Sequence, residues 1–240
     1  MPRFFCEEFK NNPVIFGEDA KHISRSLRMK IGEQLTVCDT HGTDYLCEIE
    51  NLSDDAVYLK ILSTKQNDSE PNLKVTLFQC LPKGDKLDLV VQKAVELGVN
   101  EIIPVMSSRC VSKPDQKAAD KKRVRMQKIS DQAAKQSGRG ILPKIKPIIN
   151  FNECCEKLAQ FDKSIIFYEL GGEPLAKIIN KTAKTCAVII GPEGGLSQEE
   201  VALANSKGAV SATLGKRILR TETAPLAALT AIMLLSGNLE

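Results

Sequence analysis

The first seventy residues carry short apolar runs that are separated by turns. Runs of this kind lie at residues 35–38, 45–49 and 56–62, after a short stretch of helical character at 23–29. Short apolar runs bounded by turn residues are typical of β-strands. The sequence therefore predicts a small domain resembling a β-barrel over residues 1–70.

The pattern changes after a polar stretch at residues 63–72, which we interpret as a linker. From residue 74 onward, buried apolar runs alternate with segments of helical periodicity. Strands are expected at 75–80, 101–105, 164–168, 187–190 and 210–214, and helices at 85–97, at 116–136, after residue 197 and at 223–240. Such alternation is typical of an α/β domain with a largely parallel sheet. The second predicted domain covers residues 71–240.

Two loops of the second domain have the pattern of a ligand site. They are IGPEGGLSQEE at 190–200 and LGKRILRTETAPLAAL at 214–229, and each connects a predicted strand to a predicted helix. Ser197 and Glu200 have the spacing of a capping box, and Thr223 is the expected N-cap of the last helix. Ligands bind beyond the carboxyl ends of strands in open α/β sheets, and glycines leave backbone groups uncovered there.

The positive charge is concentrated in the middle of the chain, although the formal net charge is only +3. Residues 1–70 hold 8 Lys and Arg against 13 Asp and Glu, whereas residues 71–150 hold 16 against 7. The segment KKRVRMQK at 121–128 lies within the predicted helix 116–136, so several cations share a face. A solvated basic helix and a surface that contacts phosphates both fit this pattern.

Composition excludes other classes of protein. No apolar run approaches the length of a membrane span, and residues 1–10 lack the apolar core of a signal peptide. The 8 cysteines are scattered without any C-x-x-C pair, which argues against a zinc site. We therefore expect a soluble cytoplasmic protein without metal and without a membrane partner.

Eight segments resemble one known family in the family's own order. They are MPRFF at 1, HISRSLRMKIGE at 22, KGDKLDLVVQKAVELGVNEIIPV at 83, SSRCV at 107, AAKQSGRGILP at 133, FYE at 167, GPEGG at 191 and LGKRILRTETA at 214. The chain thereby resembles the RsmE family, bacterial SPOUT-class methyltransferases that use S-adenosylmethionine (SAM) to methylate N3 of a uridine in 16S rRNA of the small ribosomal subunit. The resemblance implies a trefoil-knotted α/β domain, an N-terminal PUA-like RNA-binding domain, and a homodimer. The apolar predicted helix at 223–240 agrees with a homodimer.

The resemblance also implies the residues of the site. Those expected to bind SAM are Tyr168, Glu169, Gly191, Glu193, Gly194, Leu214, Gly215, Ile218, Leu219, Arg220, Thr223 and Ala224. Candidates for contacts with RNA are Arg3, Arg25, Arg28, Lys121, Lys122, Arg123 and Arg139. Both histidines, His22 and His41, lie in the first domain, so the proton of N3 must be lost by another route. Glu222 is a candidate proton acceptor, and Arg220 and Arg139 are candidates to stabilise negative charge on the uracil carbonyls, which is the route we favour.

Three alternatives remain at this point. A SPOUT methyltransferase acting on a ribose 2′-oxygen or on guanine is the closest one. An RNA-binding ribosome assembly factor without catalysis is another. A nucleotide-dependent oxidoreductase or NTPase fits poorly, because the chain has neither G-x-G-x-x-G after its first strand nor a P-loop motif.

Overall fold

The computed structural model describes residues 1–53 and 55–239. Its contacts separate two compact units. The first contains residues 1–70 together with 134–142, and the second contains residues 71–133 and the chain from residue 143 onward. The segment 134–142, which the sequence assigned to the second domain, therefore makes most of its contacts within the first unit.

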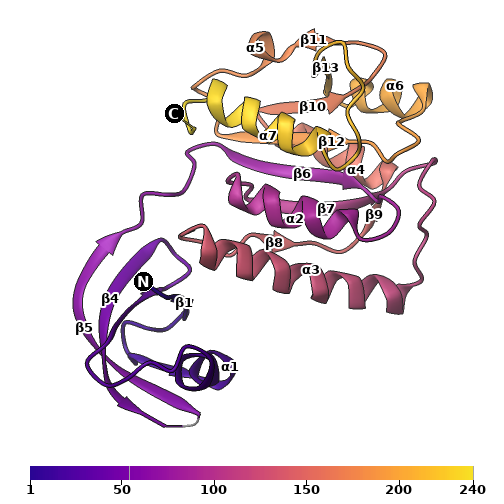
Figure 1. Cartoon of the computed structure of the whole chain (residues 1–240). Helices are drawn as coiled ribbons and strands as arrows, with labels where there is room; N and C mark the ends of the chain where they lie inside the picture. Colours follow the sequence, from indigo (N-terminus) through magenta and orange to yellow (C-terminus); the bar gives the residue numbers. More distant parts are fainter. Residues whose placement is uncertain (54, 240) are drawn as a thin grey trace. The chain divides into compact units, whose positions relative to one another are not determined.

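The first unit is built on a curled five-stranded sheet with the order β1-β3-β4-β5-β2 (Figure 1). β1 pairs with β3 in parallel, and the other neighbours are antiparallel. Its strands are β1 (Arg3–Phe5), β2 (Val14–Phe16), β3 (Gln34–Cys38), β4 (Thr43–Leu52) and β5 (Ala56–Gln66). Fully buried Phe9, Ile23 and Leu35 belong to its core.

Two local predictions in the first unit were wrong. The helical stretch begins earlier than expected, as α1 (Gly17–Lys21) followed by the π-helix η1 (His22–Ser26). The strand predicted at 56–62 continues to Gln66, which pairs with Thr43 of β4. Polar side chains do not end a strand whose backbone still has a hydrogen-bonded neighbour, so residues 63–66 of the expected linker belong to the sheet.

The second unit has a parallel sheet with the order β11-β13-β10-β12-β6-β7-β8, and β9 also pairs with β7. The strands are β6 (Lys74–Cys80), β7 (Glu101–Met106), β8 (Lys144–Ile145), β9 (Ile149–Asn150), β10 (Lys163–Phe167), β11 (Glu173–Pro174), β12 (Thr185–Ile190) and β13 (Val210–Thr213). The central strands are buried along nearly their whole length, because helices cover both faces of the sheet. The α/β prediction for this part of the chain is confirmed.

Helices α2, α5 and α7 lie on one face of this sheet, and α4 and α6 lie on the other (Figure 1). The helical segments are α2 (Lys86–Glu96), α3 (Gln116–Gln136), α4 (Phe151–Lys157), the short 3-10 helix η2 (Leu158–Gln160), α5 (Leu175–Ile178), α6 (Gln198–Ser206) and α7 (Ala224–Leu235). α3 has the predicted bounds, and Gly138 follows it with a φ of 73°. Among the described residues, no helix is both long enough and apolar enough to cross a bilayer.

The helix starts give one confirmed and one wrong prediction. Ser197 and Glu200 form the expected capping box at the start of α6. Thr223 precedes α7, but its backbone is already helical (φ −91°, ψ −38°) and its side chain caps nothing. An N-cap side chain needs an extended backbone to reach back to the free N–H groups. Residue 240, included in the predicted last helix, lies outside the described residues.

Candidate functional site

Three loops of the second unit meet at the carboxyl ends of neighbouring strands. β10 lies between β13 and β12 in the sheet, and all three strands run in parallel. Their following loops therefore leave the same edge of the sheet. These loops, together with the first residue of α2, surround a cavity of about 540 Å³.

The cavity brings together the residues expected to bind a cofactor, apart from Thr223. Those that line it are Tyr168, Glu169, Gly191, Glu193, Gly194, Leu214, Gly215, Ile218, Leu219, Arg220 and Ala224. Leu214 and Leu219 are half-buried and provide apolar wall, whereas Ile218 is 83% exposed at the rim. The three loops therefore form one site, as their position after parallel strands predicted.

Gly195, which the sequence did not single out, allows the tightest packing in the site. Its φ is 67°, a conformation that side chains disfavour, and an added Cβ would overlap Oε1 of Glu169. Gly194 next to it has no positive φ, and a Cβ there would lie 3.3 Å from Cβ of Arg109. Arg109 itself donates to the carbonyl oxygen of Gly194 at 2.9 Å. The loop after β12 therefore packs closely against Glu169 and Arg109, and its glycines leave the backbone uncovered.

A buried threonine joins two of the loops. The Thr221 hydroxyl donates to the carbonyl oxygen of Gly191 at 2.9 Å, and it accepts from the Gln79 side-chain amide at 3.3 Å. Gln79 and Thr221 are both buried. Nothing in the sequence distinguished Thr221 from the other threonines of its loop, because the bond depends on strands that are far apart in the sequence.

The first residue of α2 also reaches both loops. The Lys86 ammonium lies 2.9 Å from Oε1 of Glu193 and 3.3 Å from Oε2 of Glu222. Hydrogen bonding to Glu193 raises the pKa of Lys86, a rise that burial opposes and Glu222 supports. Burial favours a higher pKa for Glu193, but hydrogen bonds from Lys86 and from the Lys83 N–H outweigh it and lower that pKa. Lys86 and Glu193 are therefore both charged at neutral pH.

Cations lie at the rim of the cavity. Lys216, Arg217 and Arg220 are exposed, and their side chains form no ion pair with any residue that the structure describes. Unpaired guanidinium groups are well suited to bind carbonyl or phosphate oxygens. Arg220 therefore presents a cation at the mouth of the cavity that has no ion-pair partner among the described residues. Neither His22 nor His41 lines the cavity.

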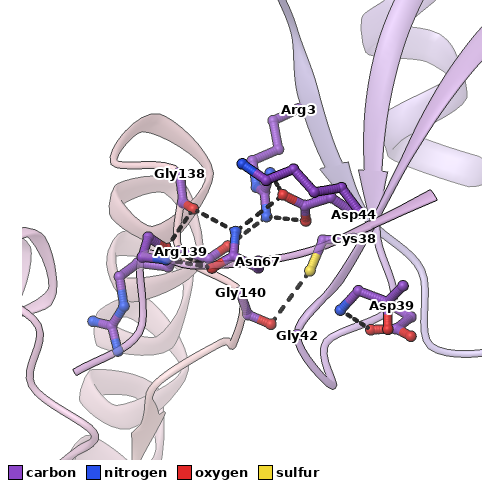
Figure 2. Close-up of polar contacts among 12 residues, drawn as sticks. Arg3, Cys38, Asp39, Gly42, Asp44, Asn67, Gly138, Arg139 and Gly140 are labelled. Atoms are coloured by element: carbon purple, nitrogen blue, oxygen red, sulfur yellow. Dashed lines mark hydrogen bonds and ion pairs between the residues drawn. The ribbon is translucent and has the colours of Figure 1, made fainter. Parts of the chain in front are cut away.

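Two arginines expected to contact RNA are instead engaged inside the first unit, and Figure 2 shows the contacts of Arg3. The Arg3 guanidinium donates to both carboxylate oxygens of Asp44, at 2.9 and 2.6 Å, and to the carbonyl oxygen of Arg139 at 2.8 Å. The Arg139 side chain is 3% exposed and pairs with Glu70 through two bonds of 2.8 Å. Both guanidinium groups bind carboxylates of the first unit. The expectation that they present charge to RNA was therefore wrong.

The other expected cations lie nearer the surface. Lys121 is exposed on α3, and Lys122 and Arg123 are half-buried there. Arg25 and Arg28 are exposed in the first unit, and Arg28 has a φ of 53°. α3 also exposes Lys128, while Arg125 pairs with Asp88. The basic face predicted for this helix is therefore present in part.

The potential metal-ligating side chains of residues 1–53 and 55–239 are dispersed. No group of three or more His, Cys, Asp and Glu side chains is placed there to hold a metal ion. The cysteines are free thiols, and all but Cys6 are buried. Burial raises the pKa of Cys38 to about 11 and that of Cys47 to about 12.

Family models match both units. Residues 69–233 match an RNA methyltransferase domain, and residues 16–62 match an RNA methyltransferase PUA domain. The first match covers more than half of the chain. It includes the three loops and the whole cavity described above.

Relatives are similar over nearly the full length. A ribosomal RNA small subunit methyltransferase E from Bacillus subtilis is 37% identical, over 97% of this chain and 96% of that protein. The structure of the enzyme of that name from Neisseria gonorrhoeae, bound to S-adenosyl methionine, is 34% identical with a TM-score of 0.89 and 98% coverage of both chains. A putative methyltransferase from Legionella pneumophila with bound SAM is 30% identical, with a TM-score of 0.88 and coverage of 98% of this chain and 97% of that chain. With this extent of similarity, the chain belongs to the ribosomal RNA small subunit methyltransferase E family.

Proposed function

We propose that this protein transfers a methyl group from SAM to N3 of a uridine in 16S rRNA of the small ribosomal subunit. The observation that carries the proposal is the cavity at the carboxyl ends of β10, β12 and β13, in a chain of this family. The relative from Neisseria gonorrhoeae has SAM bound in its structure. The choice of uridine N3 rests on the resemblance of the sequence motifs.

The cavity fits SAM in size and chemistry. Its volume of about 540 Å³ is in the range of small-molecule sites. Leu214 and Leu219 offer an apolar slot for adenine, and the uncovered backbone around Gly194 and Gly195 offers hydrogen bonds. The positively charged sulfonium of SAM would be attracted by the nearby carboxylates, which are Glu193, Glu169 and Glu222. The cofactor residues expected from the sequence therefore remain our assignment, with Thr223 the weakest because its side chain does not reach the cavity lining.

Bound SAM supplies an electrophilic methyl group, and the residues of this chain must prepare N3 to receive it. Arg220 is the residue we assign to the uracil carbonyls, because it lines the cavity and its side chain forms no ion pair with any described residue. A fixed positive charge there stabilises the anion that forms when N3 loses its proton. Glu222 is the weaker candidate for proton acceptor, since its carboxylate is already paired with the Lys86 ammonium at 3.3 Å. Arg139 leaves the catalytic assignment because its side chain is buried against Glu70.

The RNA surface is assigned to Lys121, Lys122 and Arg123 on α3 and to Arg25 and Arg28 in the first unit. The PUA match of residues 16–62 supports an RNA-binding role for that unit. Arg3 and Arg139 support this surface indirectly, by holding the segment 134–142 within the first unit.

We further propose a homodimer of the SPOUT class with a trefoil knot, located in the cytoplasm. α7 supports the dimer, because it buries Leu229 and Ile232 and still leaves Leu234 59% exposed. A helix that covers only its own core needs a narrower apolar stripe. Light scattering tests the dimer, and a fully active monomer would contradict it.

Two measurements test the proposal. Calorimetry with purified protein should show SAM binding without added metal. The single-turnover rate of methyl transfer should rise with pH through the neutral range, because N3 must lose its proton before it attacks. A flat profile with chemistry shown to be rate-limiting would remove this mechanism.

A further inference from the structure

Lys86 occupies a position that helix stability does not explain. It is the first residue of α2, where the N–H groups at the helix start carry partial positive charge. A cation is disfavoured there, and an acidic residue is the usual choice. The lysine side chain instead turns to the cavity, which it lines.

One ammonium group connects two loops at this point. Glu193 belongs to the loop after β12, and Glu222 belongs to the loop after β13. Nζ of Lys86 lies 2.9 Å from the first carboxylate and 3.3 Å from the second. The Lys86 side chain is 34% exposed, so solvent screens the pairs only in part.

The two carboxylates depend on Lys86 to different degrees. Glu193 also accepts from the Lys83 backbone N–H, at 3.1 and 3.3 Å. Oε2 of Glu222 is buried and has no aligned hydrogen bond among the described residues. Its ion pair with Lys86 therefore offsets the cost of removing this carboxylate oxygen from water. Without Lys86, Glu222 would hold a poorly compensated charge beside a second carboxylate, which favours movement of its loop.

We propose that Lys86 is a positioning residue of the SAM site, which fixes the distance between the loops after β12 and β13 by holding Glu193 and Glu222 together. This inference rests on the proposed function of the cavity. The three groups carry a formal net charge of −1, which suits a ligand with a sulfonium. Lys86 acts through the loops and needs no contact with the methyl group.

The test compares Lys86→Met with Lys86→Arg and with Lys83→Met as the matched control. The Lys83 side chain makes no ion pair among the described residues, and its N–H, which holds Glu193, survives the substitution. Calorimetry measures the Kd for SAM and for its product S-adenosylhomocysteine, which lacks the sulfonium charge, and thermal unfolding checks the fold. Steady-state assays with undermodified small subunits give kcat and KM.

Loss of the charge-assisted contacts should weaken binding of both ligands by about tenfold in Lys86→Met. KM for SAM should rise more than kcat falls, Lys86→Arg should restore most of the affinity, and Lys83→Met should match the wild type. Lys86→Gln replaces Lys86→Met if the latter does not fold.

Unchanged binding of both ligands in a folded Lys86 variant overturns the inference. Tighter binding of SAM alone also overturns it, because Lys86 would then act only through its charge. A wild-type protein that binds no SAM refutes the proposed function itself.

Discussion

The hydroxyl of Thr221 donates a hydrogen bond to the carbonyl oxygen of Gly191 at 2.9 Å. Gly191 begins the loop after β12, and Thr221 belongs to the loop after β13. Thr221 is 5% exposed, so water cannot replace this bond freely. A buried neutral contact thus complements the charged contacts of Lys86, and the two together hold the loops at the cavity.

Thr221→Val should destabilise the protein by about 1–3 kcal/mol, because the Gly191 carbonyl loses its hydroxyl donor and the Gln79 amide loses one of its two acceptors, keeping the Cys80 carbonyl. SAM binding should weaken as well, since the loop walls lose their link. Denaturant unfolding and calorimetry measure the two effects. Thr221→Ser keeps the hydroxyl and is the control. Equal stability and affinity in Thr221→Val would show that the bond has no such role.

Gly195→Ala should damage the site far more than Gly194→Ala. The first substitution forces a side chain to a φ of 67° and into the Glu169 carboxylate, whereas the second only tightens a contact with Arg109. The backbone strain alone is worth about 1–2 kcal/mol. We expect Gly195→Ala to lose most SAM affinity by calorimetry and Gly194→Ala to retain a measurable part. The reverse order would mean that the loop is arranged differently when ligand binds.

Much of the fold could be predicted from hydrophobic periodicity. The alternation after residue 74 predicted the parallel sheet, and the bounds of α3 were predicted without error. The short strands β1, β2 and β11 were missed, because two or three residues carry no periodic signal. The segment 134–142 could not be assigned to the first unit, since its hydrogen bonds with Arg3 and Asn67 join residues far apart in the sequence and leave no local pattern.

The loops that border the cavity could be predicted from backbone chemistry, whereas their role as a SAM site stays a prediction. Glycines after apolar strands marked the loops, and the resemblance supplied the remaining lining residues. Lys86 and Thr221 were missed because their partners lie on other strands and loops. The sequence did carry one signal for Lys86: a lysine in the first turn of a predicted helix is unfavourable there, which indicates another role for its side chain. Arg3 and Arg139 were misjudged because a charge in the sequence does not reveal its ion-pair partner.

Glu70→Gln should destabilise the protein by roughly 3 kcal/mol, because a neutral amide cannot replace the carboxylate that pairs with the buried Arg139 guanidinium. Glu70 also accepts from the Gly140 N–H, so the segment 134–142 should loosen. Denaturant unfolding measures the loss. Asp68→Asn removes an exposed pair with Lys65 and should change stability by less than about 1 kcal/mol. Similar small effects of both substitutions would argue that Arg139 is not anchored in this way.

Lys121→Ala, Lys128→Ala and Arg28→Ala should weaken binding to the small subunit and leave SAM affinity intact. Each lost phosphate contact should reduce the slope of log K against log salt by about 0.7–0.9. Lys207→Ala removes an exposed cation near the end of α6 and serves as the control for charge alone. Salt slopes equal to that of the wild type in all three variants would place the RNA elsewhere.

The central claim is tested most directly by locating the transferred methyl group. The protein is incubated with labelled SAM and small ribosomal subunits that lack the modification, and the 16S rRNA is digested and examined by mass spectrometry. The account predicts label on N3 of a single uridine. Label on a ribose oxygen or on guanine, or no transfer by protein that binds SAM, would contradict it.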